Sequence, residues 1–304
     1  MGDQIMNHIR EGAGDPPIVF VHGYLCELEN WRHQVDHFQA TNTVLACDLR
    51  GLGKTPLGDG KMTIEQMGQD VVALLAHHDL TDAVLVGHSM GCRVIMEACR
   101  QAKDRVGGLV LVDGSRGGQN RAPDQAKFDL AISESGYKSF VEALFEGMFF
   151  GEGPDWKDAA LEAVFGVPED IGKPLYRNLI AWDAEQLDPA LAAIDVPVLV
   201  LQSTYMNLER KREQLQAGET SPYQDLVTER LADTHSVTIP TGHFTMIEEA
   251  AATNREIAAF LERLPPDRMN RQAVCRRRMP VSRFPIDRYG HCAGIRLVGE
   301  TRHQ

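Results

Sequence analysis

The sequence predicts an α/β fold in which helices cover both faces of a mostly parallel sheet. Short apolar runs rich in β-branched residues alternate with helical patterns through the first half of the chain. Two of these runs, 84–86 and 109–112, are apolar without interruption, which is typical of strands buried on both faces. The chain has 304 residues, 43% of them hydrophobic, which is enough to bury a deep core.

The elements expected on each side of a central insert follow from periodicity and from turn residues. Before the insert, strands are expected at 18–21, 43–47, 83–87 and 108–112, and helices at 31–38, 64–77 and from about 94. After it, strands are expected at 197–201 and 236–239, and a last helix at about 250–264. The helix at 64–77 is the clearest, because Met67, Val71 and Leu74 fall on one face.

The alternation stops between residues 115 and 194, where only helical patterns occur. This segment is expected to be a helical lid over the strand ends, and residues 1–114 and 195–264 the core. The lid holds ten of the twenty aromatic residues, most of which would fill its own core while a few line an apolar substrate pocket. Residues 265–304 carry nine arginines and no lysine, and are expected to form an extension beyond the fold.

The charge balance argues against two classes of partner. With 43 acidic and 31 basic residues the net charge is −12, which argues against a nucleic-acid surface or an anionic membrane as main partner.

No apolar run has the length of a membrane span, and the first 14 residues lack the apolar region of a secretory signal, so a cytoplasmic protein is expected. Cysteines and histidines are not clustered at zinc spacing, so no metal site is expected.

The strongest chemical signal is the G-x-S-x-G sequence at residues 87–91. An expected strand precedes it and an expected helix follows it, so the sharp turn between them would expose the Ser89 hydroxyl at the end of the sheet. A serine hydroxyl needs an adjacent base to act as a nucleophile near neutral pH. His243, in the loop after the last expected strand, is the candidate base.

A set of motifs in fixed order resembles the lidded α/β-hydrolase superfamily, a resemblance that spans residues 16 to 264. The motifs are His22-Gly23 after the first strand, Asp48-x-Arg50-Gly51-x-Gly53, the turn at 87–91, the helical insert, and the late Gly242-His243. The resemblance implies an eight-stranded, mostly parallel sheet with a helical lid inserted after the sixth strand. It also implies a Ser–acid–His triad and no cofactor.

The resemblance also implies an oxyanion hole formed by the backbone N–H groups of Tyr24 and Met90. The acid departs from the commonest pattern, because residues 202–207, where it usually follows the strand, contain no carboxylate. Asp113, after the preceding strand, is the preferred candidate, and it would hold His243 in the correct tautomer. The alternatives are Glu209 and Asp183, while Asn207 could only orient the histidine. His22, Arg50 and Gly51 are expected to shape loops near the site.

The expected activity is hydrolysis of a carboxylic ester or lactone with an apolar acyl or aromatic part, through an acyl-enzyme on Ser89. A serine at this position argues against dehalogenase and epoxide-hydrolase chemistry, which in related proteins uses aspartate. Carbon–carbon bond hydrolysis or perhydrolysis on the same triad, a cofactor-free oxygenase, and a non-enzymatic ligand receptor remain alternatives.

Overall fold

The computed structural model describes residues 5–58, 61–150, 156–207 and 211–265. Its centre is a sheet of seven strands in the order β1-β3-β2-β4-β5-β6-β9. The edge strand β1 is antiparallel to β3, and the other neighbours are parallel. The strands are β1 (His8–Glu11), β2 (Ile18–Val21), β3 (Val44–Cys47), β4 (Ala83–His88), β5 (Val106–Val112), β6 (Val198–Gln202) and β9 (Thr234–Thr238).

The expectation of eight strands is wrong for the described residues, which contain seven in this sheet. The described chain has a single strand, β1, before β2, and the sequence pattern did not predict it. Its burial explains why: His8 and Ile9 are half-buried and Arg10 and Glu11 are exposed, so the strand lacks an apolar run. In chain order the helical insert therefore follows the fifth strand, and not the sixth.

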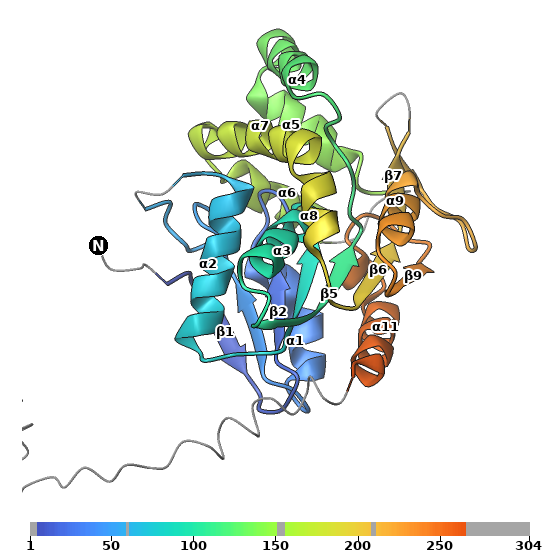
Figure 1. Ribbon diagram of the computed structural model, residues 1–304. Coiled ribbons are helices and arrows are strands. Elements are labelled where there is room, and N and C mark those ends of the chain that lie inside the picture. Colours follow the sequence, from blue (N-terminus) through green and yellow to red (C-terminus); the bar gives the residue numbers. More distant parts are fainter. Residues whose placement is uncertain (1–4, 59–60, 151–155, 208–210, 266–304) are drawn as a thin grey trace, which may run out of the picture.

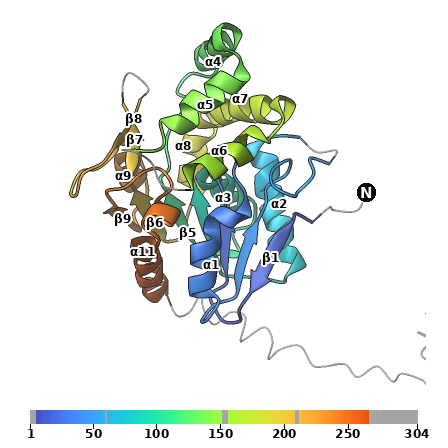
Figure 2. The ribbon, with the colours of Figure 1, turned by 180° about the vertical axis from the view of Figure 1, so that it is seen from behind.

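Helices cover the two faces of the sheet. Figure 1 shows α2 and α3 on one face, and Figure 2, from behind, shows α1 and α11 on the other. The helices outside the insert are a short 3-10 turn (Leu28–Trp31), α1 (Arg32–Phe38), α2 (Ile64–His77), α3 (Met90–Gln101), α9 (Pro222–Arg230), α10 (Thr245–Glu248) and α11 (Ala250–Arg263). The helix predicted at 64–77 is confirmed, and Thr63 caps it by accepting a hydrogen bond from Gln66 N at 3.2 Å.

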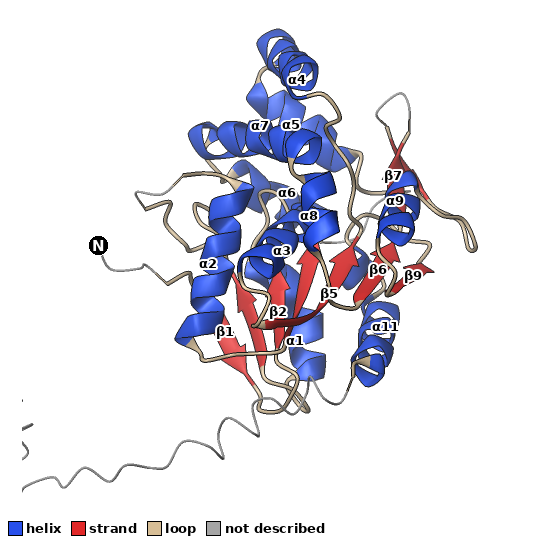
Figure 3. Cartoon of the chain, viewed as in Figure 1, coloured by secondary structure: helices blue, strands red, loops and turns tan. Residues whose placement is uncertain are grey.

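The insert between β5 and β6 consists of helices, as the sequence predicted. Figure 3 shows most of them beyond the arrowhead ends of the parallel strands. They are α4 (Arg121–Ser135), α5 (Tyr137–Glu146), α6 (Lys157–Phe165), α7 (Glu169–Glu185) and α8 (Leu187–Ala193). A separate antiparallel hairpin, β7 (Thr204–Met206) and β8 (Arg212–Gln214), follows β6.

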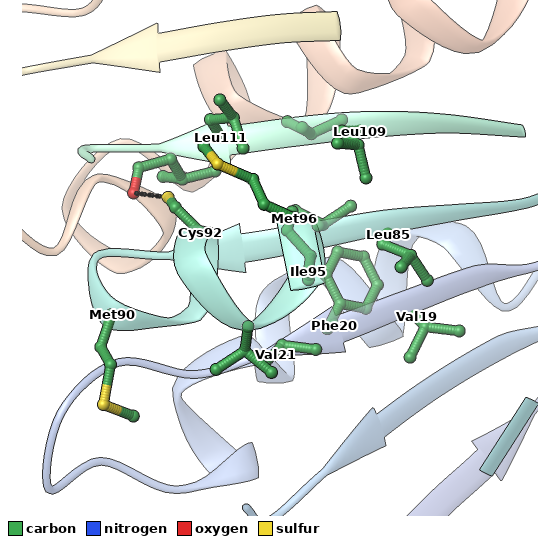
Figure 4. Close-up of a cluster of buried hydrophobic side chains, with 14 of the residues drawn as sticks. Val19, Phe20, Val21, Leu85, Met90, Cys92, Ile95, Met96, Leu109 and Leu111 are labelled. Atoms are coloured by element: carbon green, nitrogen blue, oxygen red, sulfur yellow. Dashed lines mark hydrogen bonds between the residues drawn. The ribbon is translucent and has the colours of Figure 1, made fainter. Parts of the chain in front are cut away.

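The main core lies between α3 and the central strands. In Figure 4, Cys92, Ile95 and Met96 of α3 face side chains of β2, β4 and β5. The fully buried strand residues of this layer are Val19, Val21, Leu85, Leu109 and Leu111, whereas Phe20 points to the opposite face, where its ring packs against Trp31 and Phe38. Because α3 begins at Met90, this packing fixes the position of the turn that carries Ser89. No helix in the described ranges is both long enough and apolar enough to span a membrane.

Candidate active site

Ser89 lies at the sharp turn between β4 and α3. The strand ends at His88 and the helix begins at Met90, so Ser89 alone connects the two. Its backbone has φ 53° and ψ −110°, a conformation that a residue with a Cβ rarely adopts. The side chain is half-buried, and its hydroxyl makes no hydrogen bond within the described residues. Strained turns of this kind are concentrated at functional sites.

The two glycines of the motif are required by close backbone contacts. A Cβ on Gly91 would lie 2.4 Å from the carbonyl oxygen of Val21, and one on Gly87 would lie 2.4 Å from the carbonyl oxygen of Gly91. Real Cβ atoms do not approach backbone oxygens this closely. The glycines therefore allow α3 to start directly against the end of β2.

His243 and Asp113 meet in the interior, 130 residues apart in the chain. His243 follows β9 and Asp113 directly follows β5, and His243 Nδ1 lies 2.6 Å from Asp113 Oδ2. With the carboxylate ionised, Nδ1 carries the ring's proton and donates a hydrogen bond to Asp113 Oδ2, which leaves Nε2 as the acceptor. An imidazole held in this tautomer can accept a proton from a nucleophile.

Asp113 is held by several donors besides His243. Its Oδ1 accepts hydrogen bonds from the backbone N–H groups of Ser203 and Thr204, both at 2.8 Å. Its Oδ2 accepts one from the Thr204 hydroxyl at 2.5 Å, and Arg212 Nη1 lies 3.4 Å from the same oxygen. The segment after β6 thus supplies the donors for the acid without containing an acid itself.

Burial dominates the electrostatics of this pair. Asp113 is fully buried and His243 is 1% exposed. Burial lowers the pKa of His243 well below its usual value, and the charges of Arg212 and Arg93 lower it further. Burial raises the pKa of Asp113, and Arg212 together with the donors of Thr204 and Ser203 opposes that rise. The His243 imidazole is consequently neutral near pH 7.

The alternative acids take other positions. The Asp183 carboxylate is buried against Arg93, with Arg93 Nε 2.7 Å from Oδ1 and Nη2 2.7 Å from Oδ2, so it belongs to an ion pair and not to His243. Asn207 lies in the β7–β8 hairpin, where its side-chain amide donates to Glu213 at 2.6 Å. Glu209 lies outside the described residues.

The backbone of His243 is held on two sides. His88 Nε2 lies 2.9 Å from the His243 carbonyl oxygen and donates to it, and the His243 N–H donates to the carbonyl of Met148 at 3.2 Å. The Glu248 carboxylate accepts the flanking amides of Gly242 and Phe244, each at 3.1 Å. The turn at Ser89, the insert and α10 therefore all fix this loop. Neither His88 nor Met148 was predicted from the sequence to hold this loop.

The loop after β2 approaches Ser89. A Cβ on Gly23 would lie 3.4 Å from Ser89 Cβ, which places the next residue, Tyr24, beside the turn. Met90 is the first residue of α3, where helix N–H groups have no intrahelical acceptor. In the described part of the chain, neither the Tyr24 nor the Met90 amide donates to a backbone group outside the regular elements. Both amides are thus available to an anion at this end of the helix.

His22, Arg50 and Gly51 hold loops, as predicted. His22 Nε2 accepts the Leu49 amide at 2.9 Å, and its Nδ1 lies 2.8 Å from the Gly23 carbonyl oxygen. The Arg50 guanidinium pairs with both carboxylate oxygens of Asp70, each at 2.5 Å. Gly51 has φ +72°, in the region that favours glycine.

Aromatic side chains of the insert surround Phe244, the residue after His243. Phe149 stacks on Phe244 with ring centroids 5.4 Å apart, and Trp156 meets it edge-on at 5.3 Å. On the other side of the site, the Tyr24 hydroxyl lies 2.8 Å from that of Tyr137, which belongs to α5. Apolar rings with a few hydroxyl groups are a typical lining for small organic ligands. Across the described ranges, no three His, Cys, Asp or Glu side chains converge as metal ligands would.

The family model described as "Alpha/beta hydrolase family" matches residues 18–256. The chain belongs to the alpha/beta hydrolase family. This match includes β2, the turn at Ser89, the helical insert and His243, so the site described above lies inside the family's common fold.

Similar proteins carry several enzyme names. 3-Oxoadipate enol-lactonase 2 of Acinetobacter baylyi is 23% identical over 271 residues, which cover 86% of this chain and 94% of that protein. The solved structure titled "Est816 as an N-Acyl homoserine lactone degrading enzyme" has 25% identity and a TM-score of 0.67, covering 84% of this chain and 96% of its own.

Some curated relatives share only a segment with this chain. A dihydrolipoyllysine-residue acetyltransferase component of the acetoin cleaving system of Pseudomonas putida is 36% identical over 101 residues, or 33% of this chain. The match covers 27% of that protein's own length. This similarity therefore covers only one segment of a longer protein.

Proposed function

We propose that the protein is a serine hydrolase that cleaves a carboxylic ester or lactone with an apolar acyl or aromatic part. The observation that carries the proposal is the contact of His243 Nδ1 with buried Asp113, 2.6 Å apart, beside the strained turn at Ser89. This contact fixes the tautomer that leaves Nε2 of His243 free to accept the Ser89 proton. The names of the enol-lactonase and the lactone-degrading relative support the substrate class.

In the proposed mechanism, His243 removes the Ser89 proton as Oγ attacks the acyl carbon. The negative charge on the carbonyl oxygen is stabilised by the N–H groups of Tyr24 and Met90. His243 then protonates the leaving alkoxide, and a water activated by His243 hydrolyses the acyl-enzyme. Loss of one such oxyanion donor typically costs about 3 kcal/mol of barrier.

The insert, residues 115–194, is proposed to act as a lid that completes the substrate pocket. Two contacts support this role: the Met148 carbonyl accepts the His243 N–H, and the Tyr137 hydroxyl meets that of Tyr24. The rings of Phe149 and Trp156 beside Phe244 would give such a pocket an apolar wall that suits an alkyl or aromatic acyl group.

The experiment measures hydrolysis of p-nitrophenyl acetate, butyrate and octanoate and of an N-acyl homoserine lactone. The wild type is compared with Ser89→Ala, His243→Gln and Asp113→Asn, and Ser133→Ala, an exposed serine of the insert, is the matched control. Activity should vanish in Ser89→Ala, fall by about 10⁴ in Asp113→Asn and stay unchanged in Ser133→Ala.

Covalent labelling by a fluorophosphonate separates the mechanism from the substrate. Mass spectrometry should find the label on Ser89 in wild type and none in Ser89→Ala. A folded wild type that is neither labelled nor active would reject the proposal. Labelling without hydrolysis of any ester or lactone would reject the substrate class and keep the nucleophile.

A further inference from the structure

The segment after β6 places a buried arginine beside the acid. Arg212, in β8, has a side chain only 8% exposed, and its Nη1 lies 3.4 Å from Asp113 Oδ2. The same Nη1 donates to the Thr204 hydroxyl oxygen at 2.6 Å. Burying a guanidinium group costs desolvation free energy unless the group is paired, and here it is paired with Asp113 and Thr204.

The Thr204 hydroxyl lies between Arg212 and Asp113 and forms a hydrogen bond with each. A hydroxyl has one hydrogen, and the Thr204 oxygen already accepts from Arg212. Its own hydrogen therefore points to Asp113 Oδ2, at 2.5 Å. Arg212 thus acts on Asp113 both directly and through a hydroxyl that it orients.

The hairpin holds Arg212 at this place. Arg212 pairs with Met206 across the β7–β8 ladder, and Thr204 pairs with Gln214 at its base. The Leu215 amide donates to the Ser203 carbonyl at 2.8 Å, which ties the end of the hairpin to the residues that donate to Asp113. The backbone, and not only the long side chain, therefore sets the distance between guanidinium and carboxylate.

The charges that face His243 come from five parts of the fold. Asp113 directly follows β5, while β8 supplies Arg212, α3 supplies Arg93, β4 supplies His88 and α10 supplies Glu248. Of these groups, the charges of Arg212 and Arg93 lower the pKa of the His243 ring.

Among them, Arg212 has a special position. Arg93 already pairs with a carboxylate outside this set, that of Asp183. The carboxylate that Arg212 contacts within the described residues is that of Asp113 itself. Removal of Arg212 therefore changes the protonation of the Asp113–His243 pair more directly than removal of Arg93.

We infer that Arg212 is a positioning residue: it holds the Asp113 carboxylate ionised and oriented, and so sets the lowest pH at which His243 acts as a base. The inference rests on the proposed function, in which His243 is that base. A cation near an imidazole disfavours its protonation, and a cation near a carboxylate favours its ionisation. Both effects extend activity toward acidic pH.

Arg212→Met should raise the pH below which activity falls. Because the cation is lost, His243 is protonated more easily, and the acid limb of the plot of kcat/KM against pH moves to higher pH. We expect the acid limb to shift by about one pH unit or more. At a pH below both limbs, kcat/KM divided by its own plateau value should then be about tenfold lower in the variant than in wild type. Arg212→Lys keeps the charge and should restore most of the wild-type limb.

Two matched variants and a second measurement make the test decisive. Arg212→Gln removes the charge but keeps hydrogen-bonding groups, in case Arg212→Met does not fold. Arg255→Met removes an arginine on α11 whose side chain is 69% exposed, and should leave the limb unchanged. The titration of the His243 ring, followed by NMR, should move upward in Arg212→Met and Arg212→Gln alone.

The outcomes separate this inference from the proposed function. A uniform loss of rate in Arg212→Met and Arg212→Gln, with an unchanged limb and an unchanged ring titration, would overturn the inference. If wild type hydrolyses no ester or lactone, the proposed substrate fails, but the pH dependence of fluorophosphonate labelling still tests Arg212. If labelling also fails, the ring titration alone decides, because it needs no turnover.

Discussion

Arg93 and Asp183 form a two-pronged ion pair that joins α3 to the insert. Arg93 lies one turn after Ser89 on α3 and Asp183 lies near the end of α7, with both nitrogen–oxygen distances 2.7 Å. Arg93 also donates to the Ser89 carbonyl at 3.0 Å and to the Ser115 carbonyl at 2.6 Å. The insert is thus anchored to the same turn that carries the proposed nucleophile.

Asp183→Ala should be strongly destabilising, because it leaves the Arg93 guanidinium buried without its counter-ion. Loss of one partner of a buried pair typically costs about 3–5 kcal/mol, measured as the free energy of unfolding in urea. Glu185→Ala is the control, since Glu185 is in the same helix but pairs with Arg121 at the surface. That change should cost at most about 1 kcal/mol. Equal losses in the two variants would contradict this view of the pair.

Gly91→Ala should prevent α3 from packing against β2. The new Cβ would lie 2.4 Å from the Val21 carbonyl oxygen, and a backbone atom cannot move away as a flexible side chain can. We expect a loss of stability of at least about 1–3 kcal/mol, seen as low soluble yield or a lower Tm. Gly147→Ala is the control, because its Cβ would meet nothing closer than 3.5 Å and its φ is −69°. A Gly91→Ala protein as stable as Gly147→Ala would refute the steric argument.

His88→Leu should slow the reaction without touching the proposed catalytic groups. It removes the Nε2–H that donates to the His243 carbonyl at 2.9 Å and leaves that buried oxygen without this donor. Misplacement of the base is expected to lower kcat/KM by about 10- to 100-fold. His88→Gln, whose amide can reach the same carbonyl, should recover much of the rate. Equal kinetics of the Leu and Gln variants would show that the hydrogen bond has no such effect.

The protein should lose stability as the pH falls below about 6.5. Burial lowers the pKa of His22 to about 4, and burial also lowers the pKa values of His88 and His243. Between the folded and unfolded pKa values the unfolded chain binds more protons, so the free energy of unfolding decreases with falling pH. For His22 alone the loss between pH 6.5 and 4 amounts to about 3 kcal/mol.

Urea unfolding at several pH values between 7.5 and 4.5 checks this expectation. His22→Gln should flatten the dependence, since it removes one of the buried groups that must take up a proton. His235→Gln, which replaces an exposed histidine of β9, should leave the slope unchanged. A stability that is constant over this range would mean that the three rings do not remain neutral in the folded state.

Much of the fold could be predicted from local sequence. The continuous apolar strands and the amphipathic helix at 64–77 follow from periodicity alone, and the glycines at 87 and 91 mark the turn. The edge strand at 8–11 could not be predicted, because its side chains are only half-buried or exposed and it is stabilised by backbone pairing with β3. Pairing of this kind leaves little trace in composition.

The sequence by itself determined the strand–turn–helix at Ser89, the position of His243 after a strand, and Asp113 as one of three possible acids. Only the tertiary structure decided that Asp113 meets His243, that Asp183 belongs to Arg93, and that Arg212 lies against the acid. The reason is physical. A turn is encoded by neighbouring residues, whereas the partners of a buried carboxylate come from strands that are distant in the chain and adjacent only in the folded sheet.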